Sequence, residues 1–129
     1  TMYTPGIEDE FKSHAISSLH NRDCFSHGIE EEEVECTTID ILFEELELKS
    51  IDYLKVDTEG AELMILKGCE KTLKDKNIQC IQLEYGATYT DAGFNVEDII
   101  EYLNKFDYVE FFRTSEELLF AHKEDMPCD

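Results

Sequence analysis

Two carboxylate residues stand at points of the sequence where they could do chemistry. Asp57 directly follows a short apolar run, Ile51–Val56, and Glu84 ends a second run that begins at Ile78. The carboxyl ends of neighbouring parallel strands meet at one edge of a sheet, which is where open α/β sheets bind ligands. Two carboxylates there can bind a hard cation through oxygen, or one can act as a general base toward a hydroxyl. We therefore predict that Asp57 and Glu84 are catalytic residues and candidate ligands of a divalent metal ion.

Two further residues flank this pair, and we predict that Glu59 and Tyr85 contact a substrate. A structural alternative stays open for the acidic turn. Asp57 and Glu59 could instead cap the helix that follows, because a helix N-terminus stabilises an anion by roughly 0.3–1 kcal/mol. Aromatic packing is the alternative for Tyr85. Lys55, which lies inside the first run, is interpreted as a structural partner for a carboxylate.

The segments around these residues predict a strand, a helix and a second strand. The run Ile51–Val56 is short, apolar and β-branched, as expected of a buried strand. Ala61–Lys67 contains strong helix formers, and Gly68 follows where a glycine commonly ends a helix. Ile78–Leu83 is predicted as the next strand. Strands joined in this way by a helix are normally parallel, so the two carboxylates should lie at the same edge.

More elements are predicted on both sides of this unit. Val34–Thr37 is a candidate strand, and the segment after it has the spacing of an amphipathic helix, with an apolar stripe made of Ile39, Leu42, Phe43 and Leu46. Asn95 is expected to cap a third helix, whose apolar stripe is Val96, Ile99, Ile100 and Leu103. Tyr108–Arg113 and Leu118–His122 are predicted to form an antiparallel hairpin.

A family resemblance covers the centre of the chain. The stretch DYLKVDTEGAELMILKG resembles the signature of FkbM-type methyltransferases, which is close to lLKiDvEGaElevLkG. Upstream, VECTTIDILFEEL is similar to the family segment v-x-v-x-TLDdLL, and downstream IQCIQLEYG is similar to its next strand, which ends in an acidic residue. The resemblance is clear over about Val34–Gly86 and loose elsewhere. It implies S-adenosylmethionine as cofactor and methyl transfer to a hydroxyl of a sugar or another small molecule.

The glycines of the sequence do not match the family's cofactor loop, which resembles DiGAnxG. Only glycine lets the backbone approach the methionine part of the cofactor at such a turn. No two of the six glycines lie close enough to form it: Gly6, Gly28, Gly60, Gly68, Gly86 and Gly93. We therefore name no cofactor-binding residue. We expect a fragment, a truncated protein or one half of a split assembly.

The fold class that follows is α/β, with a partial Rossmann-like methyltransferase sheet of parallel strands and a C-terminal antiparallel hairpin. Residues 1–129 are expected to form a single domain, the C-terminal half of a class I methyltransferase-like fold, with 1–33 the least defined segment. The alternative function is that of a truncated or degenerate module without enzymatic activity. Such a module would bind a partner through its exposed sheet edge. A homodimer or the missing N-terminal half are the expected macromolecular partners.

Composition narrows the range of other partners. The net charge is −20, from 31 acidic and 11 basic residues, which disfavours binding to nucleic acid or to an anionic membrane.

No apolar run approaches the ~18 residues of a transmembrane helix, and the first residues lack the pattern of a signal peptide. The five cysteines include no CxxC pair, so reduced thiols and a cytoplasmic location are expected. His20, Cys24 and His27 match no zinc signature and are interpreted as loop residues.

Overall fold

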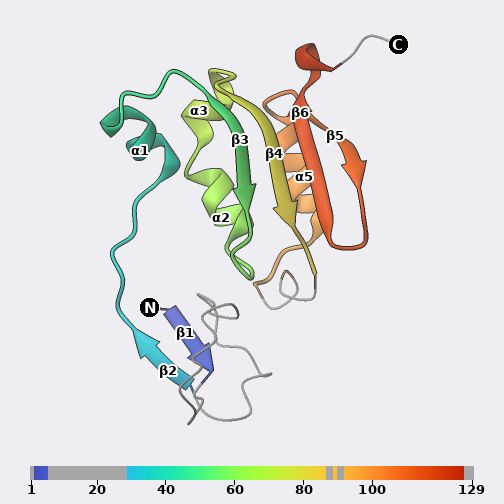
Figure 1. Cartoon of the computed structure of the whole chain (residues 1–129). Coiled ribbons are helices and arrows are strands. Elements are labelled where there is room, and N and C mark those ends of the chain that lie inside the picture. Colours follow the sequence, from blue (N-terminus) through green and yellow to red (C-terminus); the bar gives the residue numbers. More distant parts are fainter. Residues whose placement is uncertain (1, 6–28, 87–88, 90–91, 127–129) are drawn as a thin grey trace.

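The computed structural model describes residues 2–5, 29–86, 89 and 92–126 (Figure 1). Its elements follow in chain order as β1 (Met2–Pro5), β2 (Ile29–Glu32), α1 (Ile39–Glu45), β3 (Ile51–Val56), α2 (Glu62–Lys67), α3 (Glu70–Lys74), β4 (Ile78–Glu84), α5 (Val96–Asn104), β5 (Tyr108–Arg113), β6 (Glu117–His122) and a short 3-10 helix, η2 (Lys123–Asp125). The strands belong to two separate sheets. β1 and β2 form an antiparallel pair of their own. Both strands belong to the segment 1–33, which was the least defined part of the chain in the sequence analysis.

The main sheet has four strands in the order β3-β4-β6-β5. β3 and β4 are parallel, as the strand–helix–strand pattern predicts, and their register sets Val56 opposite Leu83. β6 is antiparallel to both of its neighbours and lies between β4 and β5, so the predicted hairpin joins the sheet through its second strand. The architecture is therefore α/β with a mixed sheet. Asp57 directly follows Val56 and Glu84 directly follows Leu83, and these two residues are paired in the sheet.

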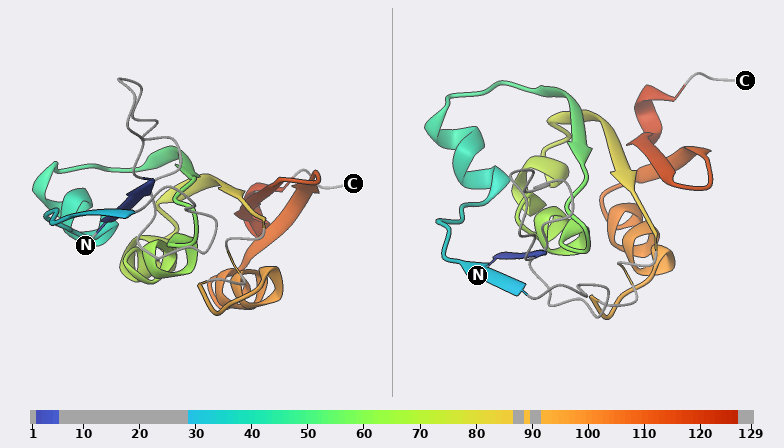
Figure 2. Two further views of the ribbon diagram at one scale, coloured as in Figure 1. Left: turned by 90° about the horizontal axis from the view of Figure 1, so that it is seen from below. Right: turned by 60° about the horizontal axis from the view of Figure 1, so that its bottom comes forward.

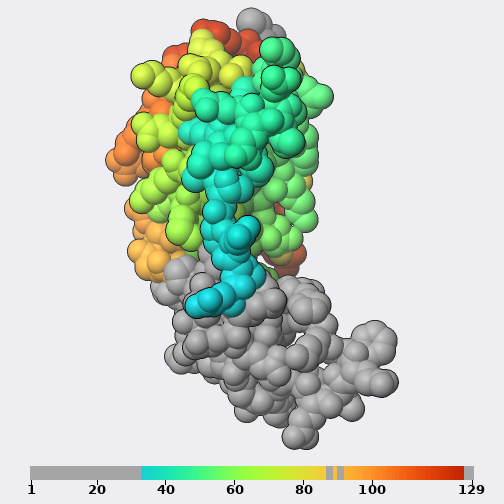
Figure 3. Space-filling model, turned by 90° about the vertical axis from the view of Figure 1, so that its left-hand side faces the viewer, coloured from blue at the N-terminus to red at the C-terminus, as the bar shows by residue number. Residues whose placement is uncertain are grey.

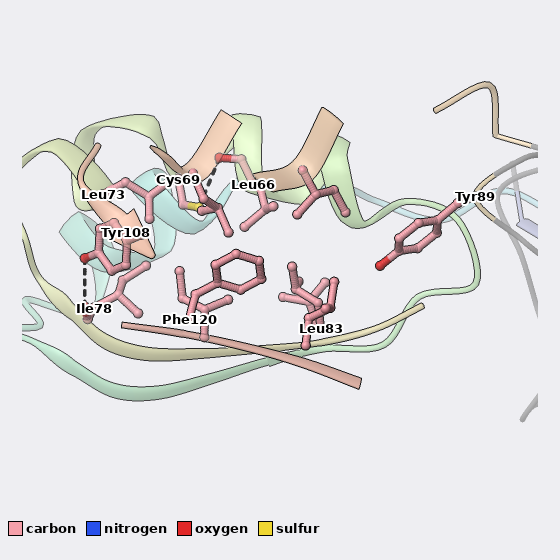
Figure 4. Close-up of a cluster of buried hydrophobic side chains, with 13 residues drawn as sticks. Leu66, Cys69, Leu73, Ile78, Leu83, Tyr89, Tyr108 and Phe120 are labelled. Atoms are coloured by element: carbon pink, nitrogen blue, oxygen red, sulfur yellow. Dashed lines mark hydrogen bonds between the residues drawn. The ribbon is translucent and has the colours of Figure 1, made fainter. Parts of the chain in front are cut away.

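Three helices, α2, α3 and α5, lie on the same face of this sheet (Figure 2). The core fills the space between them and the strands. In Figure 4, side chains of the strands point toward Leu66 and Leu73 of the helices. Tyr108, fully buried, donates a hydrogen bond from its hydroxyl to the Ile78 carbonyl over 2.7 Å, so its one polar atom has a partner inside the core. The exposure of β6 alternates along the strand, which is the pattern of a strand with one buried face.

The helix after the β4 loop forms as its sequence predicts. Asn95 accepts a hydrogen bond from the Asp98 amide, and the Asp98 carboxylate accepts one from the Asn95 amide, which together make a capping box. Of its apolar stripe, Ile99 and Leu103 are buried, and Val96 and Ile100 pack against the core. Among the described residues, no helix is long and apolar enough to cross a membrane.

One prediction in the first half of the chain is wrong, because Val34–Thr37 is not a strand and the strand nearest to it in sequence is β2. The helix predicted from the next segment is confirmed as α1. Most of its apolar stripe is not buried, however, because Leu42 and Leu46 are exposed, Leu46 to 63%. Only Ile39 of that stripe packs against the core, since α1 lies beside α3 and contacts the rest through its N-terminal turn (Figure 1).

Polar contacts hold this first turn of α1 in place. Thr38 caps the helix as predicted and accepts a hydrogen bond from the Ile41 amide. Asp40 donates its amide to the Gly68 carbonyl over 3.0 Å. Gly68 ends α2 with an ordinary φ of −79°, so the left-handed conformation expected of a terminal glycine is absent there. Its small size is what matters, because an added Cβ would lie 3.2 Å from Cβ of Thr38.

Candidate functional site

The ends of β3 and β4 form a small pocket of about 80 Å³. Its walls are Asp57, Glu59, Glu62, Glu84, Tyr85 and Gly86. All four residues that the sequence predicts for catalysis or substrate contact line this one pocket. The parallel register of β3 and β4 is the reason, since it brings the two strand ends to the same edge.

The charge of Asp57 acts on Glu84, which lines the same pocket. The negative charge of Asp57 is the largest cause that raises the pKa of Glu84, and partial burial and a hydrogen bond with Asp57 act in the same direction. Lys55 opposes the rise and Glu59 adds to it. Two adjacent carboxylates cannot both ionise without repulsion, so the raised pKa of Glu84 keeps its proton to higher pH than in a lone glutamate. A carboxylate with a raised pKa is also a stronger base.

Lys55 has the structural role that the sequence suggested. Its Nζ lies 3.2 Å from Oδ2 of Asp57, and both side chains are partly exposed. Asp57 raises the pKa of this lysine, through a hydrogen bond first and then through charge. An exposed ion pair of this kind adds little stability, so its main effect is on the local electric field at Asp57.

The turn between Asp57 and α2 has an unusual backbone. Glu59 has φ +55°, which is rare for a residue other than glycine, and Gly60 has φ +112°. Ala61 stands at the N-cap position of α2 and provides no side-chain cap. The turn therefore needs glycine at position 60, as the sequence suggests, and something other than a helix cap to stabilise it.

That stabilising residue is Glu62, which the sequence analysis did not single out. Its side chain is 1% exposed, and its carboxylate accepts hydrogen bonds from the amides of Thr58 and Gly60, over 2.9 and 3.0 Å. The sequence signal for this role is weak, because an acidic residue in a first helical turn ordinarily serves the helix dipole. The signal in the sequence that could have indicated this role is its position, two residues after Gly60.

The tyrosines beside the pocket have their hydroxyl groups engaged elsewhere. Tyr85 donates to the Thr114 carbonyl over 2.7 Å, so it offers the pocket its ring rather than its hydroxyl. Tyr89 is buried, stacks near Phe94 with ring centroids 4.6 Å apart, and donates to the backbone carbonyl of Glu84 over 2.6 Å. Tyr89 thus supports the strand end that carries Glu84.

The pocket does not fit S-adenosylmethionine. Pockets for ligands of that size measure roughly 300–1,000 Å³, and this one measures about 80 Å³ and is lined by four carboxylates. Within the described ranges, no group of three or more His, Cys, Asp or Glu side chains is placed to hold a metal ion. A metal ligated by Asp57 and Glu84 thus stays a prediction, and His20, Cys24 and His27 lie outside the described residues.

Comparison with known proteins identifies one family. The family model described as the methyltransferase FkbM domain matches residues 1–110 of the 129. The match includes β3, the acidic turn, α2 and β4, and it extends well beyond the stretch Val34–Gly86 on which the resemblance was first seen. No curated protein and no solved structure matches the chain.

Proposed function

Since the chain belongs to the FkbM methyltransferase family, we propose that it forms the acceptor side of an S-adenosylmethionine-dependent methyltransferase, in which Asp57 and Glu84 remove the proton from the acceptor hydroxyl. The cofactor is the one that the family implies. It is proposed to bind outside the pocket at the strand ends, because this pocket is too small for it.

One observation carries this proposal, namely that Asp57 and Glu84 line one pocket at the ends of adjacent parallel strands. An alcohol is a poor nucleophile until a base takes its proton, so methylation of oxygen needs a base beside the acceptor. Glu84 has the raised pKa that strengthens a carboxylate as a base. In the proposed step, the proton moves from the acceptor oxygen to Glu84, and Asp57 shares it by hydrogen bonding.

The size of the pocket supports a particular way of binding. A liquid water molecule occupies about 30 Å³, so about 80 Å³ admits a hydroxyl and its immediate neighbours and no larger group. We propose that the acceptor, a sugar or another small molecule, inserts one hydroxyl while its remainder lies outside the pocket. Glu59 and the ring of Tyr85 are the proposed contacts at the rim.

The proposed setting is the cytoplasm, without nucleic acid or membrane as partner. The three cysteines within the described part of the chain, Cys36, Cys69 and Cys80, are free thiols, as is usual for proteins in reducing compartments. A net charge of −20 repels phosphate backbones and anionic lipids.

The test is methyl transfer by the assembled enzyme carrying Glu84→Gln, with Glu101→Gln on the exposed face of α5 as the matched control. Removal of a general base costs roughly 10²–10⁴-fold in rate. We expect such a loss of kcat for Glu84→Gln, with an unchanged melting temperature, and wild-type kcat for the control. Full activity of Glu84→Gln would overturn the proposal. Activity that disappears with a chelator and returns with Mg²⁺ would assign the pair to a metal instead.

A further inference from the structure

The most deeply buried charge beside the pocket belongs to Glu62, and the proposed reaction has not used it. Three donors converge on its two oxygens. Oε1 accepts from the amide and the hydroxyl of Thr58, over 2.9 and 3.1 Å, and Oε2 accepts from the amide of Gly60 over 3.0 Å. Burial of a carboxylate is unfavourable unless it is hydrogen-bonded in this way. The three hydrogen bonds therefore satisfy both oxygens of the buried side chain and order the turn at the same time.

The turn that Glu62 holds is one that the backbone disfavours by itself. Glu59 has φ +55°, in the left-handed region where side chains other than glycine are strained. Such residues persist only where surrounding contacts over-determine them, and they cluster at functional sites. The bonds from Glu62 to Thr58 and to Gly60 lie on either side of Glu59 and supply that constraint.

Only a carboxylate satisfies this set of donors. Glutamine has one acceptor oxygen and an amino group that donates. In Glu62→Gln, that amino group would face the amide of either Thr58 or Gly60, and one donor would lose its partner. The charge at this position is therefore a structural requirement of the turn, and a neutral analogue of the same shape does not replace it.

We propose that Glu62 is a positioning residue for the Asp57–Glu84 pair. The Thr58 amide belongs to the peptide unit that follows Asp57, so the bond from this amide to Glu62 fixes the direction in which Asp57 leaves β3. Asp57 is thereby kept at the pocket that Glu84 also lines. The effect of Glu62 on catalysis rests on the proposed function. Its effect on the position of Asp57 does not, because it follows from the hydrogen bonds of this chain alone.

Several charged groups surround Glu84, and the turn that Glu62 holds positions two of them. Lys55 lies in β3 and Asp57 directly after it, Glu59 lies in the turn, and Glu117 of β6 stands opposite Glu84 in the antiparallel register. Glu117 accepts a hydrogen bond from the Gln82 amide group over 2.6 Å, and the Tyr89 hydroxyl donates to the backbone carbonyl of Glu84. Of these groups, Asp57 and Glu59 are the ones whose positions depend directly on the turn.

The test is amide hydrogen exchange at Thr58 and Gly60, together with the amide chemical shift of Asp57, in the chain as it stands, for wild type and Glu62→Gln. We expect both amides to exchange faster and the Asp57 amide to shift in the variant, because the two hydrogen bonds that hold the turn are lost or weakened. Thr58→Val removes the hydroxyl donor and keeps both amides, so it should give a smaller change in the same direction. If Glu62→Gln does not fold, Thr58→Val provides the test. Glu101→Gln should leave the exchange at both amides unchanged.

Activity of the assembled enzyme separates this inference from the proposed function. We expect Glu62→Gln to lower kcat by about 10²-fold, the effect of a small misplacement, and to leave KM for the acceptor unchanged. Wild-type exchange of the Thr58 and Gly60 amides in both Glu62→Gln and Thr58→Val would overturn the inference, even if Glu84→Gln is inactive. Full activity of Glu84→Gln, with faster exchange at these amides in Glu62→Gln, would overturn the proposed function and leave the positioning role intact.

Discussion

The Asp40 carboxylate accepts a hydrogen bond from the Thr72 amide over 2.9 Å, although 32 residues separate the two in sequence. The same carboxylate accepts from the Thr72 hydroxyl and the Lys71 amide. These amides open α3, so α3 is capped by a side chain from α1, and Cys69 at its own N-cap position provides no side-chain bond. The contact explains how α1 is held although its apolar stripe is exposed.

We predict that Asp40→Ala lowers the free energy of unfolding by about 1 kcal/mol, and by up to ~2, which is the usual effect of losing an N-cap. Urea denaturation measures it, and Glu45→Ala, on the exposed side of the same helix, is the control. Burial alone would raise the pKa of Asp40, but the hydrogen bonds from Thr72 and Lys71 outweigh it, and the net shift is downward.

The sign of this shift gives a pH dependence. A carboxyl with a lowered folded pKa contributes stability that is complete above its ordinary pKa and is lost as the pH falls through the lowered value. The difference in stability between wild type and Asp40→Ala should therefore be constant near neutrality and shrink in acid. A difference that stays the same across the acid range would show that the charge of Asp40 plays no part.

Gly68→Ala is predicted to destabilise the chain by about 1–3 kcal/mol, the range for overpacking. Its φ of −79° permits alanine, but the new methyl would lie 3.2 Å from Thr38 Cβ and 3.3 Å from the Ile65 carbonyl oxygen. Gly86→Ala is the control, because nothing lies within 4 Å of a Cβ there. Thermal melts measure both, and equal melting temperatures for the two variants would contradict the crowding argument.

The chain by itself is predicted to have no measurable affinity for the cofactor of its family. The pocket of about 80 Å³ is too small, and the sequence has no glycine pair that could form the cofactor loop. Calorimetric titration with S-adenosylhomocysteine measures this directly. Micromolar binding to the isolated chain would overturn the prediction and would locate a cofactor site within these residues.

The last prediction concerns the free side of β3. β4 is the only sheet neighbour of β3 in the described part of the chain, and an open strand edge invites pairing with another chain. Apolar side chains are also exposed on β3 and on the segment that precedes it: Val34, Ile41, Leu42, Leu46, Leu48 and Tyr53. Figure 3 views the molecule from this side, where the cyan-to-green segment that includes α1 runs along the surface. Val34–Thr37, one candidate cover, is not a strand and does not pair with β3.

We therefore expect the edge of β3 to be occupied in any stable form, by the N-terminal half that the sequence analysis proposed as a partner or by a second copy. Asp52, Lys55 and the net charge of −20 oppose self-association and favour the first of these. Hydrogen exchange of the amides from Asp52 to Val56 in a dilute monomer tests the expectation. Fast exchange there, in a chain that is otherwise folded and monodisperse, would show that the edge can stand open.

The sequence by itself determined the unit that carries the site. The apolar runs of β3 and β4, the helix formers of α2 and the glycine at position 60 are local signals, and each concerns residues within a few positions of one another. The same holds for the capping box at Asn95. Because a helical crossover makes its strands parallel, local signals were also enough to bring Asp57 and Glu84 to one edge.

Only the tertiary structure decided which residues far apart in sequence meet. It placed β6 between β4 and β5, exposed the apolar stripe of α1, and gave Asp40 its partners on α3. It also made Glu62, rather than Glu59, the buried carboxylate of the acidic turn. The physical reason is that periodicity and propensity report on the conformation of a segment, whereas burial and hydrogen-bond partners depend on what the rest of the chain packs against it.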